Sequence, residues 1–194
     1  MNNDIQKKIE KIDKSLRKKL KLSRYNHTIS VANSCALLAS INGIDINKAY
    51  LCGLLHDCAK YMSGNEMLHL AKEKGIEISD VEALKPDLLH AKLGSFLAIK
   101  KYKVDDIEIN SAILCHTTGK PNMSLLDKIL YISDYIAYGR DEIKLPRLPE
   151  VRKVAFRDID ECLKMILSDS IKYLEGSGMV IDSRTRETYE YYCL

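Results

Sequence analysis

The chain has 194 residues, of which 46% are hydrophobic and 29% charged, an ordinary composition for one folded domain with a substantial core. No apolar stretch is long enough to cross a membrane, and the charged N-terminus lacks the apolar core of a secretion signal, so we expect a cytoplasmic location. The net charge of +3 is uneven, because residues 1–24 carry nine basic and three acidic residues.

The basic N-terminal segment, residues 1–21, predicts an amphipathic helix over 4–21. Isoleucine and leucine recur there at helical spacing with lysines on the opposite side, at Ile5, Ile9, Ile12, Leu16 and Leu20. Such a segment could also contact nucleic acid, but no aromatic residues are interleaved to stack on bases. We therefore favour a solvated helix and expect no nucleic-acid partner.

Helical periodicity continues along the rest of the chain. A second helix enters at His27, which heads an inward face, and ends near Ile41 at Asn42-Gly43. A strongly apolar third helix delivers the His56-Asp57 pair. This third helix is expected over Asp45–Leu55, and further helices over Ser63–Lys74, Pro86–Lys101, Ile107–His116, Ser124–Tyr138 and Val151–Leu174. Residues 76–85 are less well defined, and the tail after Gly178 could be extended or helical.

The fold class that fits this pattern is all-α, a single helical domain over residues 1–194, because there is no internal repeat and no run of strands. We divide it into the basic helix over 1–21, a helical core over about 22–140, and a C-terminal helix and tail over 150–194. Six cysteines without a Cys-x-x-Cys pair are expected to be buried free thiols, and neither disulfides nor a cysteine-bound zinc is expected.

Four of the five histidines lie at or near the ends of predicted helices, at His27, His56, His90 and His116. One such histidine is commonly a hydrogen-bonded core residue, and Asp57 could be a helix cap. Several buried imidazoles and carboxylates without partners are costly, however, and a divalent cation removes that cost. Asp134 lies on a later inward face, whereas His69 has no such context and is expected to be structural.

Longer strings around these residues narrow the identification: Arg24-Tyr25-Asn26-His27, Gly53-Leu54-Leu55-His56-Asp57-Cys58-Ala59-Lys60, His116-Thr117-Thr118-Gly119, and Ser133-Asp134-Tyr135-Ile136 with Arg140. The order His27, His56-Asp57, Asp134 resembles the H…HD…D signature of HD-domain phosphohydrolases. Within them the strings look like the YqeK-type symmetrical bis(5′-nucleosyl)-tetraphosphatases of bacteria.

The resemblance implies an HD-domain helical bundle whose core over 22–140 binds a divalent metal through His27, His56, Asp57 and Asp134. It favours iron, while manganese and cobalt also fit the ligands. His90 and His116 would hold a second ion, or would bind phosphate and donate a proton to the leaving group.

The reaction implied by the resemblance is hydrolysis of a dinucleoside tetraphosphate, such as diadenosine tetraphosphate, to two nucleoside diphosphates. A bound metal would lower the pKa of water and polarise a phosphoryl oxygen. Catalytic roles fall to Asp57, His90 and His116. The expected contacts to a dinucleoside polyphosphate or nucleoside diphosphate come from Arg24, His27, Asp57, Cys58, Ala59, Lys60, His90, His116, Thr117, Asp134 and Arg140. A homodimer is compatible with this interpretation.

Two other functions remain open from the sequence. One is a nucleotidase or phosphodiesterase of the same fold acting on another nucleotide, which product analysis would distinguish. The other is a non-catalytic nucleotide-binding regulatory module, which would bind without turnover.

Overall fold

The computed structural model describes residues 3–194, and over this range it contains α-helices, one short 3₁₀ helix and no strand, which confirms the all-α prediction. In chain order the elements are α1 (Asn3–Lys19), α2 (Leu22–Ile41), α3 (Ile46–Leu55), α4 (Gly64–Glu73), α5 (Asp80–Leu84), η1 (Pro86–Leu89), α6 (His90–Lys100), α7 (Ile107–Cys115), α8 (Leu125–Ile136), α9 (Leu148–Ala155), α10 (Ile159–Gly176) and α11 (Ser183–Cys193).

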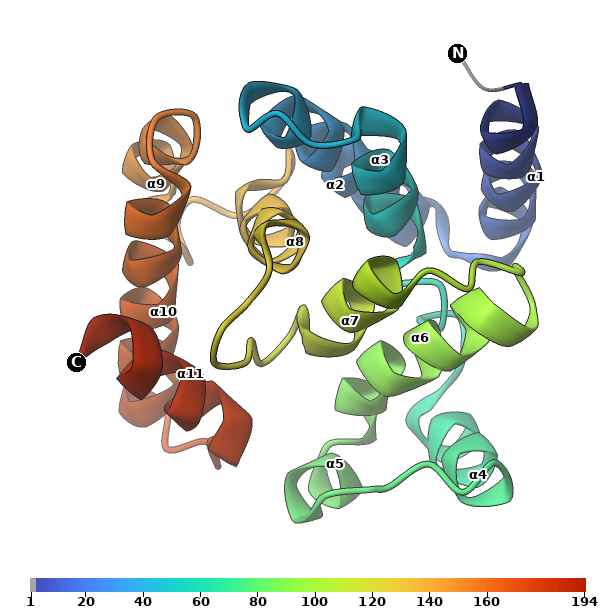
Figure 1. Cartoon of the computed structure of the whole chain (residues 1–194). Coiled ribbons are helices and arrows are strands. Elements are labelled where there is room, and N and C mark those ends of the chain that lie inside the picture. The colour runs from blue at the N-terminus through green and yellow to red at the C-terminus, as the bar shows by residue number, and fades with distance from the viewer. Residues whose placement is uncertain (1–2) are drawn as a thin grey trace.

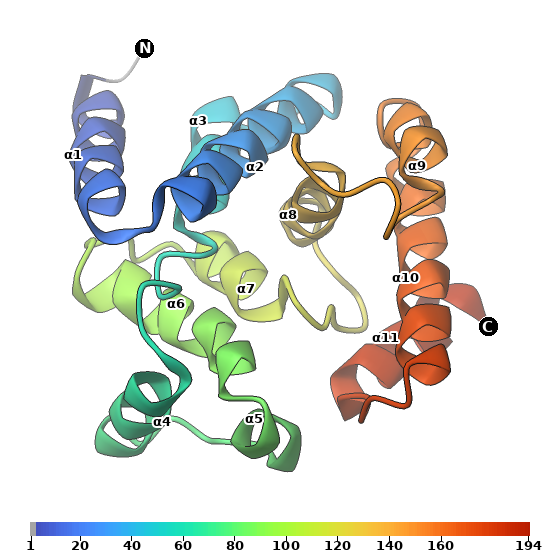
Figure 2. The same ribbon diagram turned by 180° about the vertical axis from the view of Figure 1, so that it is seen from behind.

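The helices surround a central group formed by α2, α3, α6, α7 and α8 (Figure 1). Helix α1 covers one side of this group, and the α9–α11 unit covers the opposite side. The view from behind shows the same order and places the two chain ends on opposite sides of the molecule (Figure 2). Residues far apart in sequence therefore meet in the centre.

Helix α1 buries the apolar stripe predicted from its spacing, with Ile9, Ile12, Leu16 and Leu20 all largely withdrawn from solvent. The Tyr25 hydroxyl of α2 donates a hydrogen bond of 2.7 Å to the Asp13 carboxylate of α1. The basic N-terminal helix is thus part of the domain's packing, as expected for an amphipathic helix.

Helices α2 and α3 approach unusually closely at Gly53, which has no side chain. A Cβ atom at this position would lie 2.7 Å from the Cα of Ala32 and 3.0 Å from the Cys35 sulfur. Because backbone on one helix meets backbone on the other, neither helix can move aside without losing core contacts. Gly53 therefore fixes the distance between the helices that carry His27 and His56.

Side chains near the chain's turns set the helix starts. Ser124 accepts a hydrogen bond from the backbone N–H of Asp127, and Asp127 in turn accepts from the Ser124 N–H, which confirms the cap predicted there. Ser63 and Ser79 form the same reciprocal arrangement with Glu66 and Glu82. The segment left open at 76–85 thus contains a short capped helix, and the tail forms α11.

The prediction of one long helix over Val151–Leu174 is wrong, because α9 and α10 are separate. The chain breaks between Ala155 and Ile159, where Asp158 is extended and its carboxylate accepts hydrogen bonds from the N–H groups of Asp160 and Glu161. This carboxylate satisfies backbone donors at a new helix start, so a continuous helix is not needed there.

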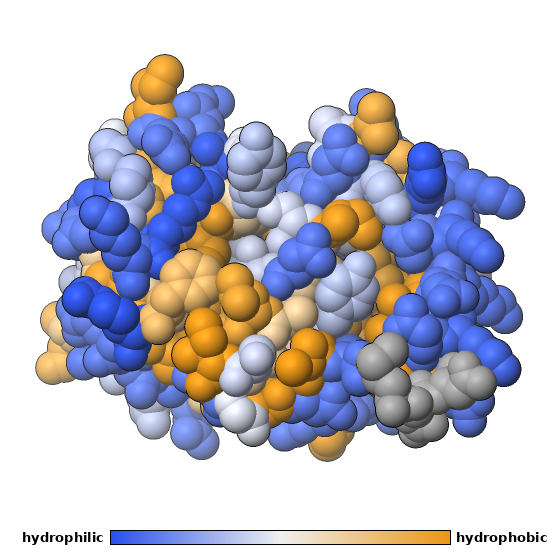
Figure 3. Space-filling view, turned by 90° about the horizontal axis from the view of Figure 1, so that it is seen from above, coloured by the Kyte–Doolittle hydropathy of each residue, from blue (hydrophilic) through white to orange (hydrophobic). Residues whose placement is uncertain are grey.

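The six cysteines are free, five of them buried, as expected. Viewed from above, hydrophobic residues gather in the middle of the face and hydrophilic residues surround them (Figure 3). Exposed apolar residues at the α2–α3 connection are Leu37, Ile41 and Ile46. None of the helices over residues 3–194 combines the length and apolar character needed to cross a bilayer.

Replacing Gly53 with alanine tests the close approach of α2 and α3. The added methyl group meets backbone of Ala32, so we expect the free energy of unfolding to fall by about 1–3 kcal/mol, measured by denaturant titration. The matched control is Gly176→Ala in α10, where a Cβ meets nothing within 4 Å. Because alanine favours helix, this control should be neutral or stabilising by up to about 1 kcal/mol. Equal effects of the two changes would contradict the packing argument.

Candidate metal centre

Three buried histidines follow one local pattern at the ends or starts of helices. In each, the ring Nδ1 lies within hydrogen-bond distance of the carbonyl oxygen three residues earlier in the chain. The pairs are His56 with Gly53 at 2.6 Å, His90 with Asp87 at 2.5 Å, and His116 with Ile113 at 2.7 Å. A carbonyl can only accept, so Nδ1 carries a proton and Nε2 faces the interior, where it offers a lone pair whenever the ring is neutral.

The carboxylate of Asp57 lies between these rings. Its Oδ2 is 3.4 Å from His56 Nε2, and its Oδ1 is 3.3 Å from His90 Nε2 and 3.9 Å from His116 Nε2. Asp57 is only 3% exposed. Burial raises the pKa of this carboxyl, but the neighbouring His56, followed by His90 and His116, outweighs burial and holds the pKa well below its usual range.

His90 and His116 present their Nε2 atoms to each other at 3.1 Å. Burial, together with repulsion from His116, lowers the pKa of His90 to about 3, and burial also lowers the pKa of His116. Both rings are therefore neutral near pH 7, and with Nδ1 protonated their lone pairs face each other. That arrangement is repulsive unless a cation or a proton lies between them.

His27 and Asp134 complete the cluster from α2 and α8. Their Nε2 and Oδ1 atoms are 2.9 Å apart. Arg140 fixes Asp134 by donating from Nε to its backbone oxygen at 2.9 Å and from Nη2 to Oδ1. Burial raises the pKa of Asp134, but the contact with His27 and the charge of Arg140 outweigh it and lower the pKa.

The donor atoms form two groups that share Asp57. One is His27, His56 and Asp57, the other Asp57, His90 and His116, and within each group the donor atoms lie within 4.8 Å of one another. The buried Nε2 atoms of His27 and His56 have no hydrogen-bond partner among the described residues. Orphaned imidazole nitrogens beside ionised carboxylates fit a divalent transition metal, so the centre can bind such a cation.

Three basic side chains that the sequence suggested as phosphate contacts lie near the centre, and their contact with substrate stays a prediction. Arg24, whose side chain is 40% exposed, donates a hydrogen bond of 2.9 Å to Asp57 Oδ2. Lys60 Nζ lies 3.4 Å from the backbone oxygen of Asp87, and burial lowers the pKa of Lys60. The centre therefore has carboxylates that attract a metal ion, and Arg24, Lys60 and Arg140 beside them carry positive charge that attracts an anionic substrate.

Two residues expected to contact substrate do not bring their side chains to the centre. Cys58 and Ala59 are fully buried, and the Cys58 thiol donates to the Gly94 carbonyl at 3.5 Å. Burial raises the pKa of that thiol to about 12. Neither residue exposes any surface to a ligand in this structure. Thr117 lies outside both donor groups and lines two cavities beside them.

A cleft that sequence analysis missed opens beside Arg140. It has a volume of about 620 Å³, within the range of ligand sites, and lies between α8, the 140–147 segment and α10. Tyr131, Tyr135 and Tyr173 contribute aromatic rings, and Arg140 and Arg147 contribute positive charge. Tyr131 and Tyr135 are four residues apart on α8, a spacing that could have indicated a shared face.

The comparisons with known proteins agree with this geometry. The family model for the HD domain matches residues 24–139. A symmetrical bis(5′-nucleosyl)-tetraphosphatase from Halalkalibacterium halodurans is 36% identical over 86% of this chain and 87% of its own length. The protein of the same name from Bacillus subtilis is 32% identical over 87% and 88%. A crystal structure from Clostridium acetobutylicum, described as a predicted HD superfamily hydrolase involved in NAD metabolism, has a TM-score of 0.89 and 37% identity over 95% of this chain and 96% of that one.

Replacing His56 with alanine tests the centre as a metal site. We expect metal content after purification to fall by at least about tenfold, because the change removes a buried ligand nitrogen. The matched control is His69→Ala, since His69 is exposed on α4 and contacts neither donor group. Elemental analysis of both variants provides the measurement. Undiminished metal in the folded His56→Ala protein would exclude His56 as a ligand.

Proposed function

The chain belongs to the HD-domain family, and from this premise we propose that it is a metal-dependent, symmetrical bis(5′-nucleosyl)-tetraphosphatase. It hydrolyses a dinucleoside tetraphosphate, such as diadenosine tetraphosphate, to two nucleoside diphosphates. The observation that carries the proposal is the set of inward Nε2 lone pairs around Asp57, with cationic side chains beside it.

The proposed cofactor is iron, held by His27, His56, Asp57 and Asp134. When bound, a divalent metal lowers the pKa of water and polarises a phosphoryl oxygen. The shared carboxylate of Asp57 supports a second ion at His90 and His116, because a cation between their Nε2 atoms relieves the repulsion at 3.1 Å. The low pKa of His90 disfavours the alternative of a shared proton.

The basic side chains neutralise and orient the tetraphosphate. Arg24 contacts Asp57 with one end of its guanidinium and is exposed enough to offer the remaining donors to phosphate oxygens. Arg140 fixes Asp134 and also lines the 620 Å³ cleft, so it joins the metal centre to the cleft. Lys60 adds a third positive charge near Asp57.

The bond that breaks in this proposal lies at the middle of the substrate. The oxygen of water bonds to one inner phosphorus atom, and the oxygen bridging the two inner phosphorus atoms leaves with the other nucleoside diphosphate. The tyrosine-lined cleft beside Arg140 holds one nucleoside, whose base packs on an aromatic ring. The cations stabilise negative charge that develops on the phosphoryl oxygens.

The proposal retains the cytoplasmic location expected from the charged N-terminal segment and leaves the homodimer as a prediction. A nucleotidase or phosphodiesterase acting on another nucleotide is the second candidate, because the same centre would serve any phosphoryl group. The relatives from Halalkalibacterium halodurans and Bacillus subtilis support the tetraphosphatase by name.

Product analysis of iron-loaded protein with diadenosine tetraphosphate tests the proposal. We expect ADP as the sole nucleotide product, with one oxygen from labelled water incorporated for each molecule cleaved. Asp57→Asn should lower kcat by more than about 100-fold, because it removes a charged donor from both groups. The matched change Asp105→Asn alters an exposed carboxylate and should have no effect. Release of ATP and AMP, or binding without turnover, would refute symmetrical cleavage.

A further inference from the structure

A second, smaller cavity lies beside the metal centre, and we infer that it binds the second nucleoside of the substrate. The inference rests on the proposed function, because only a substrate with two nucleosides needs two such sites. The cavity has a volume of about 170 Å³, below the roughly 300 Å³ of a typical ligand pocket, so it would receive only part of the nucleoside.

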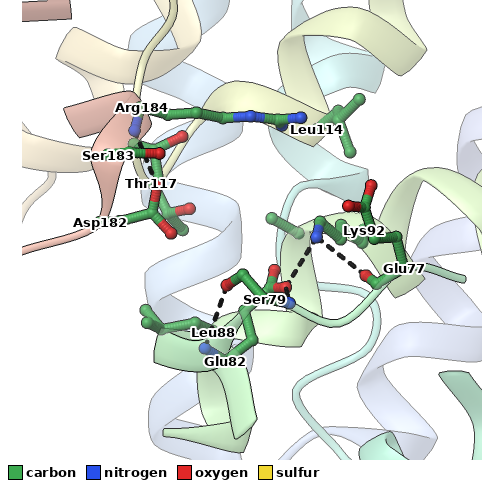
Figure 4. Close-up of a pocket in the computed structure, with 12 residues that line it drawn as sticks. Glu77, Ser79, Glu82, Leu88, Lys92, Leu114, Thr117, Asp182, Ser183 and Arg184 are labelled. Atoms are coloured by element: carbon green, nitrogen blue, oxygen red, sulfur yellow. Dashed lines mark hydrogen bonds and ion pairs between the residues drawn. The ribbon is translucent and has the colours of Figure 1, made fainter. Parts of the chain in front are cut away.

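The cavity is bounded by residues 77–82, which include the start of α5, by the start of α6, by the end of α7 and by the start of α11 (Figure 4). Leu88, Ala91 and Leu114 provide an apolar surface. Arg184 extends from α11 across the cavity toward Leu114. Segments distant in the sequence therefore close around one small space.

Four of its lining residues are close neighbours in the chain of two histidines of the metal centre. Leu88 and Ala91 lie on either side of His90 in the chain, and Leu114 and Thr117 lie on either side of His116. The same turns thus position both the imidazoles and the cavity.

Thr117 also lines the larger, tyrosine-lined cleft, so the two cavities meet at this residue. The start of α11 separates them, since Thr185 faces the large cleft and Arg184 the small cavity. The histidine next to this junction is His116, a member of the second donor group.

Symmetrical cleavage requires such an arrangement. The bond that breaks is at the midpoint of the tetraphosphate, so the two nucleosides must leave the metal centre in different directions. The large cleft accommodates one of them. The small cavity is the space on the other side of Thr117 that can receive the base or ribose of the other.

The polar groups of the small cavity suit a nucleoside. Glu77 and Asp182 offer carboxylate oxygens that can accept hydrogen bonds from ribose hydroxyls or a base amino group. Lys92 is held in place by a 2.6 Å ion pair with Glu82 and a 2.9 Å hydrogen bond to the Glu77 carbonyl. The Arg184 guanidinium can stack on the face of a base whose other face packs on Leu114.

The two cavities differ in volume and in aromatic lining. The small cavity contains no tyrosine, whereas the large cleft contains three. A substrate with a single nucleoside therefore places that nucleoside in the large cleft, and the small cavity contributes only to substrates with two.

The test compares diadenosine tetraphosphate with adenosine 5′-tetraphosphate, which has one nucleoside and the same number of phosphates. Leu114→Trp fills the small cavity from a partly exposed position. We expect it to lower the ratio of kcat/KM for the dinucleotide to kcat/KM for the mononucleotide by about tenfold or more. Arg184→Ala should lower the ratio in the same direction. If the mononucleotide is not cleaved, its Ki as a competitor takes the place of its kcat/KM.

The matched controls are Ile107→Trp on the same helix as Leu114 and Arg186→Ala on the same helix as Arg184. Neither Ile107 nor Arg186 lines the small cavity or the large cleft, so the ratio should not change. An unchanged ratio in Leu114→Trp and Arg184→Ala would refute the second nucleoside site. Failure of wild-type protein to release ADP from diadenosine tetraphosphate would refute the proposed function instead.

Discussion

The structure depends on one electrostatic constraint, the need of several buried lone pairs and carboxylates for positive charge. Backbone carbonyls hold a proton of each of three imidazoles at Nδ1, so the Nε2 atoms face Asp57 and are acceptors when the rings are neutral. Burying these groups without a cation is unfavourable. The free energy of burying the hydrophobic core must therefore offset the cost of burying these imidazoles and carboxylates. A bound metal would offset part of the same cost, because it stabilises the folded state.

Gly53 affects both the packing of the core and the position of a histidine in the metal centre. Its lack of a side chain allows α2 and α3 to come into backbone contact, and its carbonyl oxygen accepts a hydrogen bond from His56 Nδ1. Gly94 has a similar place on α6, since a Cβ there would lie 3.3 Å from the His56 carbonyl oxygen. The position of His56 is thus set on two sides by close helix packing, and a rigid core fixes ligands better than loops do.

The sequence was sufficient for the helices that begin at clear caps, such as Ser124 with Asp127, and for the histidines and aspartates that converge. The sequence did not predict the break between α9 and α10, because helical apolar spacing continues across it. Val154 and Cys162 would share a face of one continuous helix, although Asp158 starts a new helix. The inward orientation of Cys58 depends on the turn after His56, and both cavities are built from segments that only tertiary packing brings together. Such features depend on three-dimensional distance, which periodicity does not encode.

The most direct measurement of the central claim is anomalous diffraction from crystals of iron-loaded protein, recorded on both sides of the iron absorption edge. The account predicts an anomalous peak within bonding distance of His27, His56, Asp57 and Asp134, and a second one beside His90 and His116. A well-ordered crystal of metal-replete protein with no peak among these side chains, or with iron bound only at the surface, would contradict it.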